Sequence, residues 1–193
     1  MKLPTLTTSL LIAGLTFGST AVMADDYVID TKGAHASIKF RVQHLGYSWL
    51  YGRFNEFSGT FSFDEKQPDN ASIEVTIKTS SVDSNHAERD KHLRDEDFLH
   101  VSKYPEAKFV STGYSQDKDG NGVLKGNLTL RGVTKPVEID VEFIGAGDDP
   151  WGGYRAGFEG TTRFAMSDFG IMKELGPKSK DVEMILSVEG IKQ

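Results

Sequence analysis

The sequence predicts an all-β protein, an extended antiparallel up-and-down β-barrel of about eight strands with a short helical excursion near residues 85–99. Two observations predict this class. Apolar and polar residues alternate with a period of two along most of the chain, and short polar turn segments separate the alternating runs. Strands with one apolar face, in this number, close into a barrel or stack as a sandwich.

Residues 1–24 precede the first expected strand and have the pattern of a secretory signal peptide. Lys2 is their only charge, the apolar run 10–17 is too short to span a bilayer, and Val22-Met23-Ala24 offers a cleavage site before Asp25. The chain has no cysteine, so a lipid anchor on a mature N-terminal cysteine is excluded. We expect cleavage after Ala24, a periplasmic location, no stable membrane anchor, and one domain over residues 25–193.

The expected strands follow from the phase of their apolar residues. A short run lies near 27–30, and two longer runs cover 53–63 and 106–115. The other runs share one apolar phase each, with charged or polar residues between. These are Ile38, Phe40 and Val42; Ile73, Val75 and Ile77; Leu124, Leu128 and Leu130; Val137, Ile139, Val141 and Phe143; Phe158, Phe164 and Met166; and Val182, Met184, Leu186 and Val188.

Turn chemistry marks the ends of these strands at 67–70, 117–122 and 131–134. The segment 117–122 also matches the first half of a calcium-binding loop. The twelfth position of that motif requires Glu, and Leu128 stands there instead. We therefore expect a hairpin turn at 117–122.

A helix is expected over 85–99, because Asn85 and Glu88 have the spacing of a capping box. Leu93, Phe98 and Leu99 form the side that packs, and the segment is placed across one end of the barrel.

The charges of this helix predict a solvated face rather than a metal or acid–base site. His86 and Asp90 share one face, and Glu88 and His92 share another. The two pairs are offset by roughly 200° around the helix axis, so they cannot converge on one ion. Asp90 and Arg94 are expected to pair on the exposed face.

Glycines recur within the apolar phase of three strands. Gly59, Gly126 and Gly160 each stand where an inward-facing side chain is expected. They allow sharp curvature of the strand, or they leave space for a ligand in the lumen; periodicity alone does not separate a filled core from a lined cavity.

The segment 44–54 reads as an aromatic loop that follows a strand and is bracketed by glycines. Aromatic side chains on a loop suit the mouth of a pocket, and they equally suit the plugging of a barrel end. The net charge is −6, and −7 once Lys2 has been removed with residues 1–24. This acidity argues against nucleic acid as a partner and against docking on anionic lipid by bulk charge.

Five segments together resemble the YceI-like family of periplasmic polyisoprenoid-binding proteins. They are HLGYSWLYGRF (44–54), TSSVDSNHAERDKHLRDEDFL (79–99), KYPEAKF (103–109), LTLRGVTKPVEI (128–139) and GDDPWGGYRAGFEG (147–160). The resemblance covers the mature chain in order. It implies a lipocalin-like barrel that holds a long isoprenoid chain, such as a polyprenyl quinone or polyprenyl phosphate, in its lumen.

The resulting expectation is a non-enzymatic lipid-binding protein with no catalytic residue, no metal and no cofactor, and with a homodimer left open. The rival is an enzyme that acts on a lipid or its head group, with His44, His86, His92 or Asp90 as the acid–base group. The residues expected along the lumen and its mouth, inferred from strand phase, are Phe40, Val42, Leu45, Tyr47, Trp49, Leu50, Phe54, Phe61, Phe63, Val75, Leu93, Phe98, Leu99, Phe109, Gly126, Leu128, Ile139, Phe158, Gly160, Phe164 and Met184.

Overall fold

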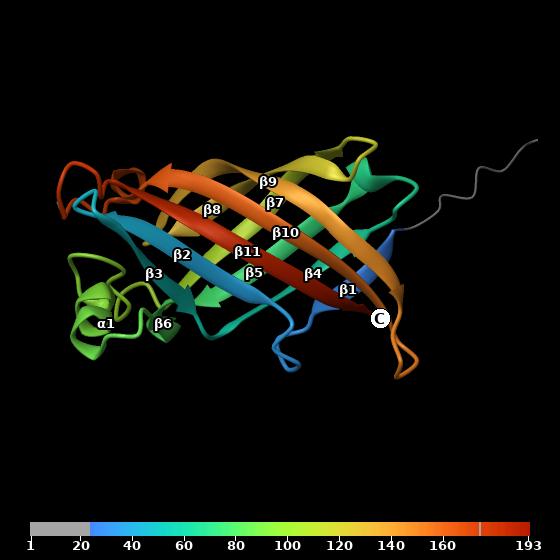
Figure 1. The fold of residues 1–193 in the computed structure, drawn as a ribbon, viewed down its shortest axis with the longest axis horizontal. Coiled ribbons are helices and arrows are strands. Elements are labelled where there is room, and N and C mark those ends of the chain that lie inside the picture. The colour runs from blue at the N-terminus through green and yellow to red at the C-terminus, as the bar shows by residue number, and fades with distance from the viewer. Residues whose placement is uncertain (1–23, 174) are drawn as a thin grey trace, which may run out of the picture.

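The computed structural model describes residues 24–173 and 175–193 and shows a closed antiparallel β-barrel with one short helix at one end (Figure 1). The predicted signal peptide lies almost wholly outside these residues. The elements in chain order are β1 (Asp25–Ile29), β2 (Ser37–His44), β3 (Ser48–Phe54), β4 (Phe57–Phe63), β5 (Ser72–Lys78), β6 (Val82–Asp83), α1 (Ala87–Arg94), β7 (Glu106–Gln116), β8 (Asn121–Leu130), β9 (Val133–Asp148), β10 (Tyr154–Ala165) and β11 (Asp181–Lys192). Three short 3-10 segments, at Pro68–Asn70, Thr79–Ser81 and Met166–Phe169, lie between them.

These strands make eight barrel strands, because three barrel strands are interrupted. Both β1 and β2 pair with β11, with Ile29 opposite Gly190 and Ser37 opposite Ser187. In the same way β4 pairs with β1 while β3 pairs with β2, and β5 pairs with β4 while β6 pairs with β3. Each barrel strand thus pairs with its neighbours in the chain, and β11 closes the ring on β1 and β2. The predicted up-and-down barrel is confirmed.

At each interruption the inward-facing residues change from odd to even positions or back, and the break in the strand keeps the apolar side chains turned inward. Phe54 ends β3 and Phe57 begins β4, and both contribute to the apolar interior. Residues three apart in a continuous strand would face opposite sides of the wall. The break at residues 55–56 restores the phase, and for this reason the predicted single run 53–63 is two strands. This break lies against the break between β5 and β6, since the backbone N–H of Asn55 donates to the carbonyl oxygen of Ser81 at 3.1 Å.

The predicted turns at 117–122 and 131–134 contain backbone in the left-handed region, with Gly120 at φ of 88° in the turn between β7 and β8. Arg131 and Gly132 have φ of 54° and 74° and join β8 to β9, as the sequence predicts. The predicted turn at 117–122 is also confirmed. There the Asp117 carboxylate accepts hydrogen bonds from the N–H groups of Asp119 and Asn121, both at 2.9 Å.

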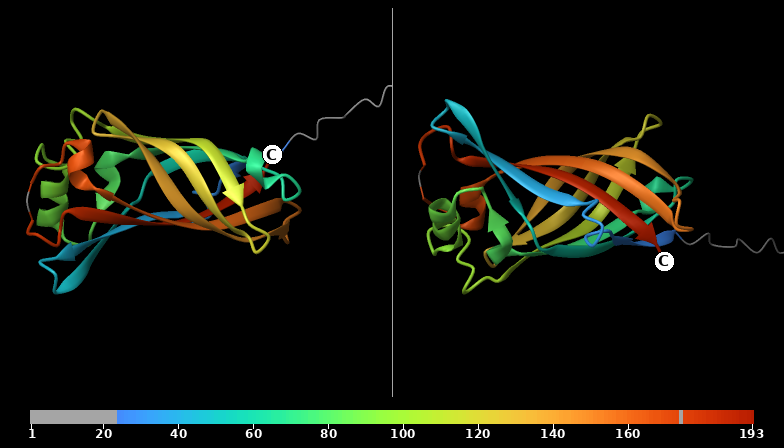
Figure 2. Two further views of the ribbon diagram at one scale, coloured as in Figure 1. Left: turned by 90° about the horizontal axis from the view of Figure 1, so that it is seen from above. Right: turned by 60° about the horizontal axis from the view of Figure 1, so that its bottom comes forward.

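The expected aromatic loop 44–54 is mostly strand. Only residues 45–47 form the loop, and Ser48–Phe54 is β3. Trp49, Tyr51 and Arg53 alternate with inward residues, and aromatic side chains favour the extended backbone. Gly46 and Gly52 interrupt this period-two pattern, so it is weak in the sequence. In both views of Figure 2 the β2–β3 hairpin projects past the barrel wall.

The helix lies where it was expected but is shorter, and its cap differs. Asn85 has φ of 59° and does not cap it. The N-cap is His86, whose Nδ1 accepts a hydrogen bond from the Arg89 N–H at 3.2 Å. The helix ends at Arg94, and residues 95–104 continue as turns.

The predicted exposed ion pair of Asp90 and Arg94 is wrong. Asp90 is buried, and its carboxylate accepts from the backbone N–H and the hydroxyl of Ser84, at 2.8 and 2.5 Å. Arg94 donates instead to the carbonyl oxygens of Ser80 and Val82. Both side chains fasten α1 to the segment before it, because they form hydrogen bonds with the backbone of that segment, where regular strand pairing is limited to two residues.

The two ends of the barrel are filled differently. At the end away from α1, five aromatic rings contact one another in stacked, tilted and edge-to-face arrangements, with centroids 4.7–5.7 Å apart. They are Tyr27, Phe61, Phe63, Phe143 and Phe158, and they form an aromatic plug. At the other end Leu93, Phe98 and Leu99 lie over the barrel opening, as predicted.

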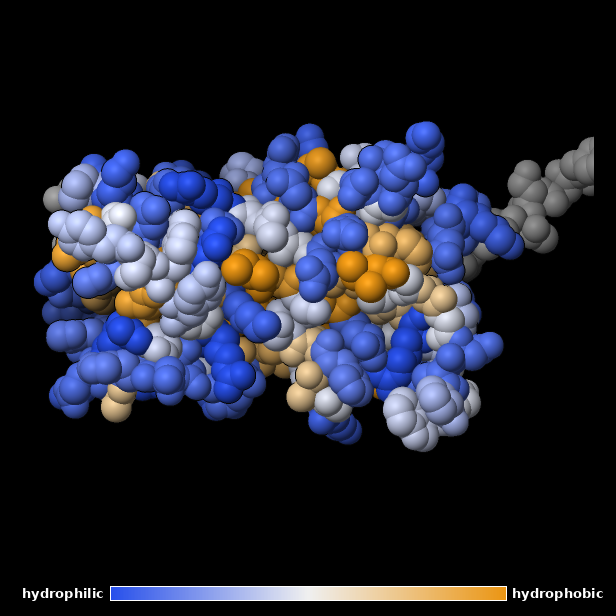
Figure 3. All heavy atoms as spheres, viewed as in Figure 1, coloured by the Kyte–Doolittle hydropathy of each residue, from blue (hydrophilic) through white to orange (hydrophobic). Residues whose placement is uncertain are grey.

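Polar and charged residues cover much of the outer face seen in Figure 3, with apolar residues gathered towards its middle. No helix in the described part of the chain is long and apolar enough to cross a membrane.

Candidate functional site

Two apolar cavities follow one another inside the barrel. The inner cavity, of ≈ 150 Å³, lies against the aromatic plug and is lined by residues such as Phe61, Val75, Phe109, Ile139 and Leu186. The outer cavity, of ≈ 540 Å³, lies beneath α1 and the segment before β11. The walls of both consist mainly of inward side chains of the barrel strands, as strand phase predicts.

Four residues belong to the walls of both cavities. They are Ile77, Leu128, Phe164 and Met184, on β5, β8, β10 and β11. They therefore form a constriction between two parts of one lumen. Met184 is unbranched and adapts its shape readily, so this constriction is lined by at least one side chain that can move aside.

Glycines on the inner face receive aromatic rings. A Cβ built on Gly52 would collide with the ring of Phe40, and one on Gly126 with the ring of Phe109. The rings thus lie close against the barrel wall instead of filling its centre. Gly160 differs, because its nearest neighbour would be Ile139 Cγ2 at 3.0 Å and it lines the inner cavity. Of the two glycines expected along the lumen, only Gly160 borders the open space.

One polar atom in the inner cavity has no protein partner. Tyr114 is buried, lines this cavity, and its hydroxyl has no hydrogen-bond partner among the described residues. Gln116 follows it on β7, but its side-chain amide donates to the carbonyl oxygen of Gly120 at 3.2 Å.

The mouth of the outer cavity carries the polar groups. Gln43, His44, Arg89, His92, Asp97, Lys173 and Ser179 all belong to its wall. Lys173 pairs with Asp97 at 2.8 Å, and Arg89 donates through Nε to the hydroxyl of Ser84 at 2.7 Å. Charge is thus concentrated where the lumen meets solvent.

The barrel wall has a seam beside this mouth. β3 pairs with β6 only through Arg53 and Phe54, so in the described pairings residues 48–52 are bonded on the β2 side alone. A depression of ≈ 460 Å³ lies between this edge and the start of α1. His44, Leu50 and Arg89 line both the depression and the outer cavity, so the lumen approaches solvent sideways here.

The residues predicted along the lumen divide into two groups. Four line neither cavity: Gly126 lies under Phe109, and Leu45, Tyr47 and Trp49 are exposed on the β2–β3 hairpin. The others line one or both cavities. They are Phe40, Val42, Leu50, Phe54, Phe61, Phe63, Val75, Leu93, Phe98, Leu99, Phe109, Leu128, Ile139, Phe158, Gly160, Phe164 and Met184.

Some wall residues were not predicted. Ile38, Ile77 and Leu186 stand in the inward phase, so the alternation was sufficient to include them. Ile171 and Leu175 come from the irregular segment before β11, where no periodicity signals which side chain turns inward.

The four acid–base candidates do not form one group. His86 caps α1, and Asp90 is buried against Ser84. His44 and His92 line the mouth of the outer cavity, with the charged groups described above. Two of the four thus have structural roles, and two remain available to a ligand.

One cluster has donor atoms spaced as in a metal site. Asp30, His35 and Glu189 bring ligand atoms within 4.8 Å of one another. Arg155 already joins two of them, with its Nη1 2.8 Å from Asp30 Oδ2 and 2.5 Å from Glu189 Oε1. Its guanidinium, together with the N–H of Gly33, holds the pKa of Asp30 well below its usual range. The cluster is an ion-pair network that fastens the first strand break to β10 and β11.

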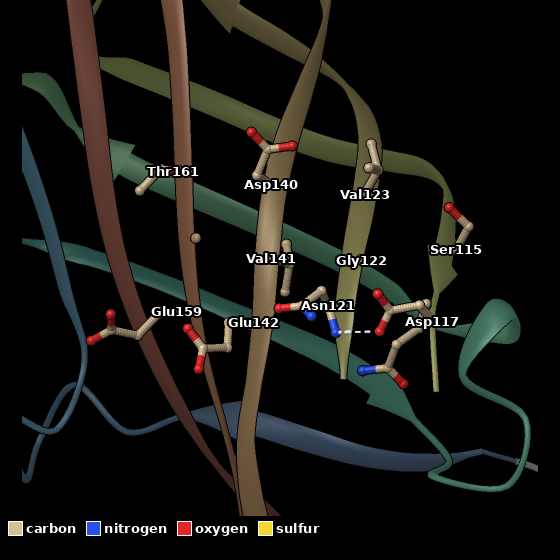
Figure 4. Close-up of a pocket in the computed structure, with 12 residues that line it drawn as sticks. Ser115, Asp117, Asn121, Gly122, Val123, Asp140, Val141, Glu142, Glu159 and Thr161 are labelled. Carbon is tan, nitrogen blue, oxygen red and sulfur yellow. Dashed lines mark hydrogen bonds between the residues drawn. The ribbon is translucent and has the colours of Figure 1, made fainter. Parts of the chain in front are cut away.

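A larger depression, of ≈ 680 Å³, lies on the outer wall and shares Val141, Glu159 and Gly160 with the wall of the inner cavity (Figure 4). It spans the outer faces of β8, β9 and β10, where Asp140, Glu142 and Glu159 project as exposed carboxylates. Glu142 stands directly opposite Glu159 in the sheet. This face presents like charges to solvent, with no buried polar group to build a site.

Known proteins match the chain both in sequence and in fold. A "UPF0312 protein" of Pseudomonas aeruginosa is 58% identical over 185 residues, which are 96% of each chain. The structure of a YCEI protein of Campylobacter jejuni is similar with a TM-score of 0.71 and 29% identity, covering 79% of this chain and 90% of that one.

A polyisoprenoid binding domain from Saccharophagus degradans has a TM-score of 0.62 at 13% identity, covering 86% of this chain and 98% of its own; this likeness concerns the fold. Residues 27–190 match the YceI-like domain. The chain, with its barrel closed by β11 and its lumen capped by α1, therefore belongs to the YceI-like family.

Proposed function

We propose that this protein is a non-enzymatic carrier that holds one isoprenoid lipid in the barrel lumen. The observation that carries the proposal is the distribution of charge. The lumen wall is apolar from the aromatic plug to the constriction, and the ionisable groups of the outer cavity gather at its mouth. An enzyme would instead place titratable groups around a reacting atom inside the pocket.

Among the described residues that line the inner cavity, Glu159 alone is charged, and its carboxylate is exposed on the outer face of β10 (Figure 4). The lumen therefore offers a ligand little besides apolar contact. Each methylene that leaves water contributes about 0.8 kcal/mol. A prenyl chain supplies many such groups, which suits a site that selects by shape and apolarity.

The lumen volume sets what such a chain must do on binding. At ~30 Å³ for each carbon-sized group, cavities of ≈ 150 and ≈ 540 Å³ hold about twenty carbons. A longer prenyl chain fills both cavities only if the constriction at Ile77, Leu128, Phe164 and Met184 opens, and its remainder leaves through the mouth. The name of the Saccharophagus degradans domain, which has the same fold, supports an isoprenoid as the ligand class.

We further propose that the protein is exported and works in the periplasm, on the strength of the signal-peptide pattern in residues 1–24.

Native mass spectrometry of protein purified from its own cells tests the carrier. The expected spectrum contains the protein together with one prenyl-lipid mass, a quinone or a phosphate. The same protein, stripped of lipid, should regain one equivalent of a long-chain prenol added in detergent. Protein that is isolated empty and takes up no prenol refutes the proposal. Turnover of an added prenyl phosphate would favour the enzymatic rival.

A further inference from the structure

We propose that the α1 end of the barrel docks on the surface of a phospholipid bilayer that contains anionic lipid. The first observation is where exposed apolar side chains gather. Ten large apolar side chains are clearly exposed in the described part of the chain, and six of them lie at this end. They are Leu45, Tyr47, Trp49 and Tyr51 on the β2–β3 hairpin and Met172 and Leu175 in the segment before β11.

These two segments form one surface, which we call the mouth surface: residues 44–51, 170–173 and 175–180. Leu45 Cδ2 lies 2.9 Å from where a Cβ on Gly176 would stand, and Lys178 Cγ lies 3.1 Å from the corresponding point on Gly46. The hydroxyl of Ser179 donates to the Gln43 carbonyl oxygen. Figure 2 shows the hairpin projecting at this end, beside the segment that leads into β11.

The mouth surface is basic although the protein is acidic. Residues 170–180 contain Lys173, Lys178 and Lys180 against Glu174, and Lys173 is paired with Asp97, so the excess positive charge rests on Lys178 and Lys180, whereas the whole chain has a net charge of −6. His44 is exposed on the hairpin side. Lysines near an anionic leaflet are attracted to it, and aromatic side chains prefer the region of the lipid head groups. Exposed apolar and aromatic side chains flanked by lysines therefore match the surface of an anionic bilayer, where both kinds of group find favourable contacts.

The mouth surface is also continuous with the lumen. His44, Leu50, Lys173 and Leu175 belong both to it and to the wall of the outer cavity. Docking would therefore bring the cavity mouth and the seam onto the bilayer. An apolar chain could then pass between membrane and lumen without crossing water. The docking itself does not require the cargo, so the two proposals can be tested separately.

The test measures flotation of lipid-free mature protein with vesicles of phosphatidylethanolamine and phosphatidylglycerol. Tyr47 and Met172 are 88% and 72% exposed, so Tyr47→Ser with Met172→Ser removes apolar surface without disturbing the core. We expect vesicle binding to fall at least tenfold. The matched control is Ile144→Ser with Trp151→Ser, at positions 59% and 78% exposed and outside the mouth surface. Its binding should equal that of the unchanged protein.

The two tryptophans of the chain provide a second readout. Trp49 follows the hairpin tip, whereas Trp151 lies in the β9–β10 turn at the far end of the barrel. In Trp151→Phe the remaining Trp49 should be quenched by phospholipids brominated on their acyl chains. In Trp49→Phe the remaining Trp151 should keep its fluorescence. Raising the salt concentration or omitting phosphatidylglycerol should weaken binding, since the lysines contribute to it.

Three outcomes overturn the docking proposal. One is a wild-type protein that does not float with these vesicles. Another is an equal loss of binding in the mouth and control variants, or quenching of Trp151 rather than Trp49. The third is an unchanged protein that sediments as a dimer and does not bind vesicles, while the Tyr47→Ser, Met172→Ser variant alone sediments as a monomer. The mouth surface is then a contact between two copies of the chain. A protein that floats but carries no prenyl lipid leaves the docking standing and refutes the carrier.

Discussion

Replacing Gly160 with leucine should empty the inner cavity of ligand while the barrel stays folded. Gly160 faces this cavity from β10, and a Cβ there would lie 3.0 Å from Ile139 Cγ2 and 3.6 Å from Leu186 Cδ1. Leu186 Cδ1 is the end of a flexible side chain and can shift, whereas Ile139 Cγ2 is a methyl group on a stiff β-branched Cβ and must give by a few tenths of an ångström. At ~30 Å³ for each carbon-sized group, the leucine side chain takes up ~120 Å³ of the ≈ 150 Å³ available.

The cost to folding should be moderate. Overpacking of this kind destabilises by ~1–3 kcal/mol, and in a domain of this size each kcal/mol lowers Tm by about 2–4 °C. We therefore expect Gly160→Leu to melt ~2–12 °C below the unchanged protein and to retain the circular dichroism of a β-barrel. Native mass spectrometry should show its prenyl-lipid adduct reduced at least tenfold.

The matched control is Gly157→Leu on the same strand. A Cβ on Gly157 would meet nothing closer than the Gly145 carbonyl oxygen at 3.8 Å, on the opposite face of the wall from Phe158. This variant should keep its lipid. If folded Gly160→Leu carries as much lipid as Gly157→Leu, the ligand does not enter the inner cavity and the reasoning fails. Gly126→Leu serves as a contrast, because it must displace the Phe109 ring and should destabilise more strongly.

Four further predictions follow from other parts of the structure. Tyr114→Phe should raise the Tm of the lipid-free protein, because an unpartnered buried hydroxyl costs about 1–3 kcal/mol; a lower Tm would mean that the hydroxyl is satisfied. Arg155 lowers the pKa of Asp30, so the stabilisation by the Asp30 carboxylate is present above the unfolded pKa of ~3.9 and is lost as the pH falls below it. Asp30→Asn should therefore lower Tm at pH 7 and make Tm fall less steeply between pH 5 and 2. Curves of Tm against pH that run parallel for the two proteins would contradict this. His86→Ala should cost ~1 kcal/mol through loss of the cap, and lipid loading should survive it; lost loading would instead point to the enzymatic rival. N-terminal sequencing of the exported protein should begin at Asp25, and a chain that retains residues 10–17 would disprove export by cleavage.

The sequence was sufficient to predict the barrel because its strands follow one rule, the alternation of inward apolar and outward polar residues. From β7 to β11 each barrel strand is one uninterrupted strand, and there the predicted runs and the observed strands overlap, although a β-bulge shifts the apolar phase near residue 112 of β7 and near residue 144 of β9. The first three barrel strands hide this rule. Their phase changes at 30–36, 55–56 and 79–81, and a change of phase within a run does not reveal whether the chain turns or merely kinks.

The α1 region was harder to predict, for a different reason. Its charged residues were expected on the exposed side, since charges in a short helix usually are. Asp90 and Arg94 instead satisfy backbone groups of the segment 80–84, whose need for partners becomes apparent only when β6 is seen to pair through two residues. The mouth of the lumen likewise takes Lys173 and Leu175 from an irregular segment that has no pattern to read.

Rings set against glycines leave the constriction as the narrow part of the lumen, and this has a consequence for selectivity. Phe40 lies against Gly52, Phe109 against Gly126 and Phe61 against Gly190, so each ring occupies the space that an inward side chain at the glycine would fill. A lumen of this kind limits the thickness of a chain at the constriction, whereas a single methyl branch would be worth only ~1–3 kcal/mol. Such a lumen discriminates between ligands by thickness and length, and it tolerates chains whose double bonds or branches differ in position.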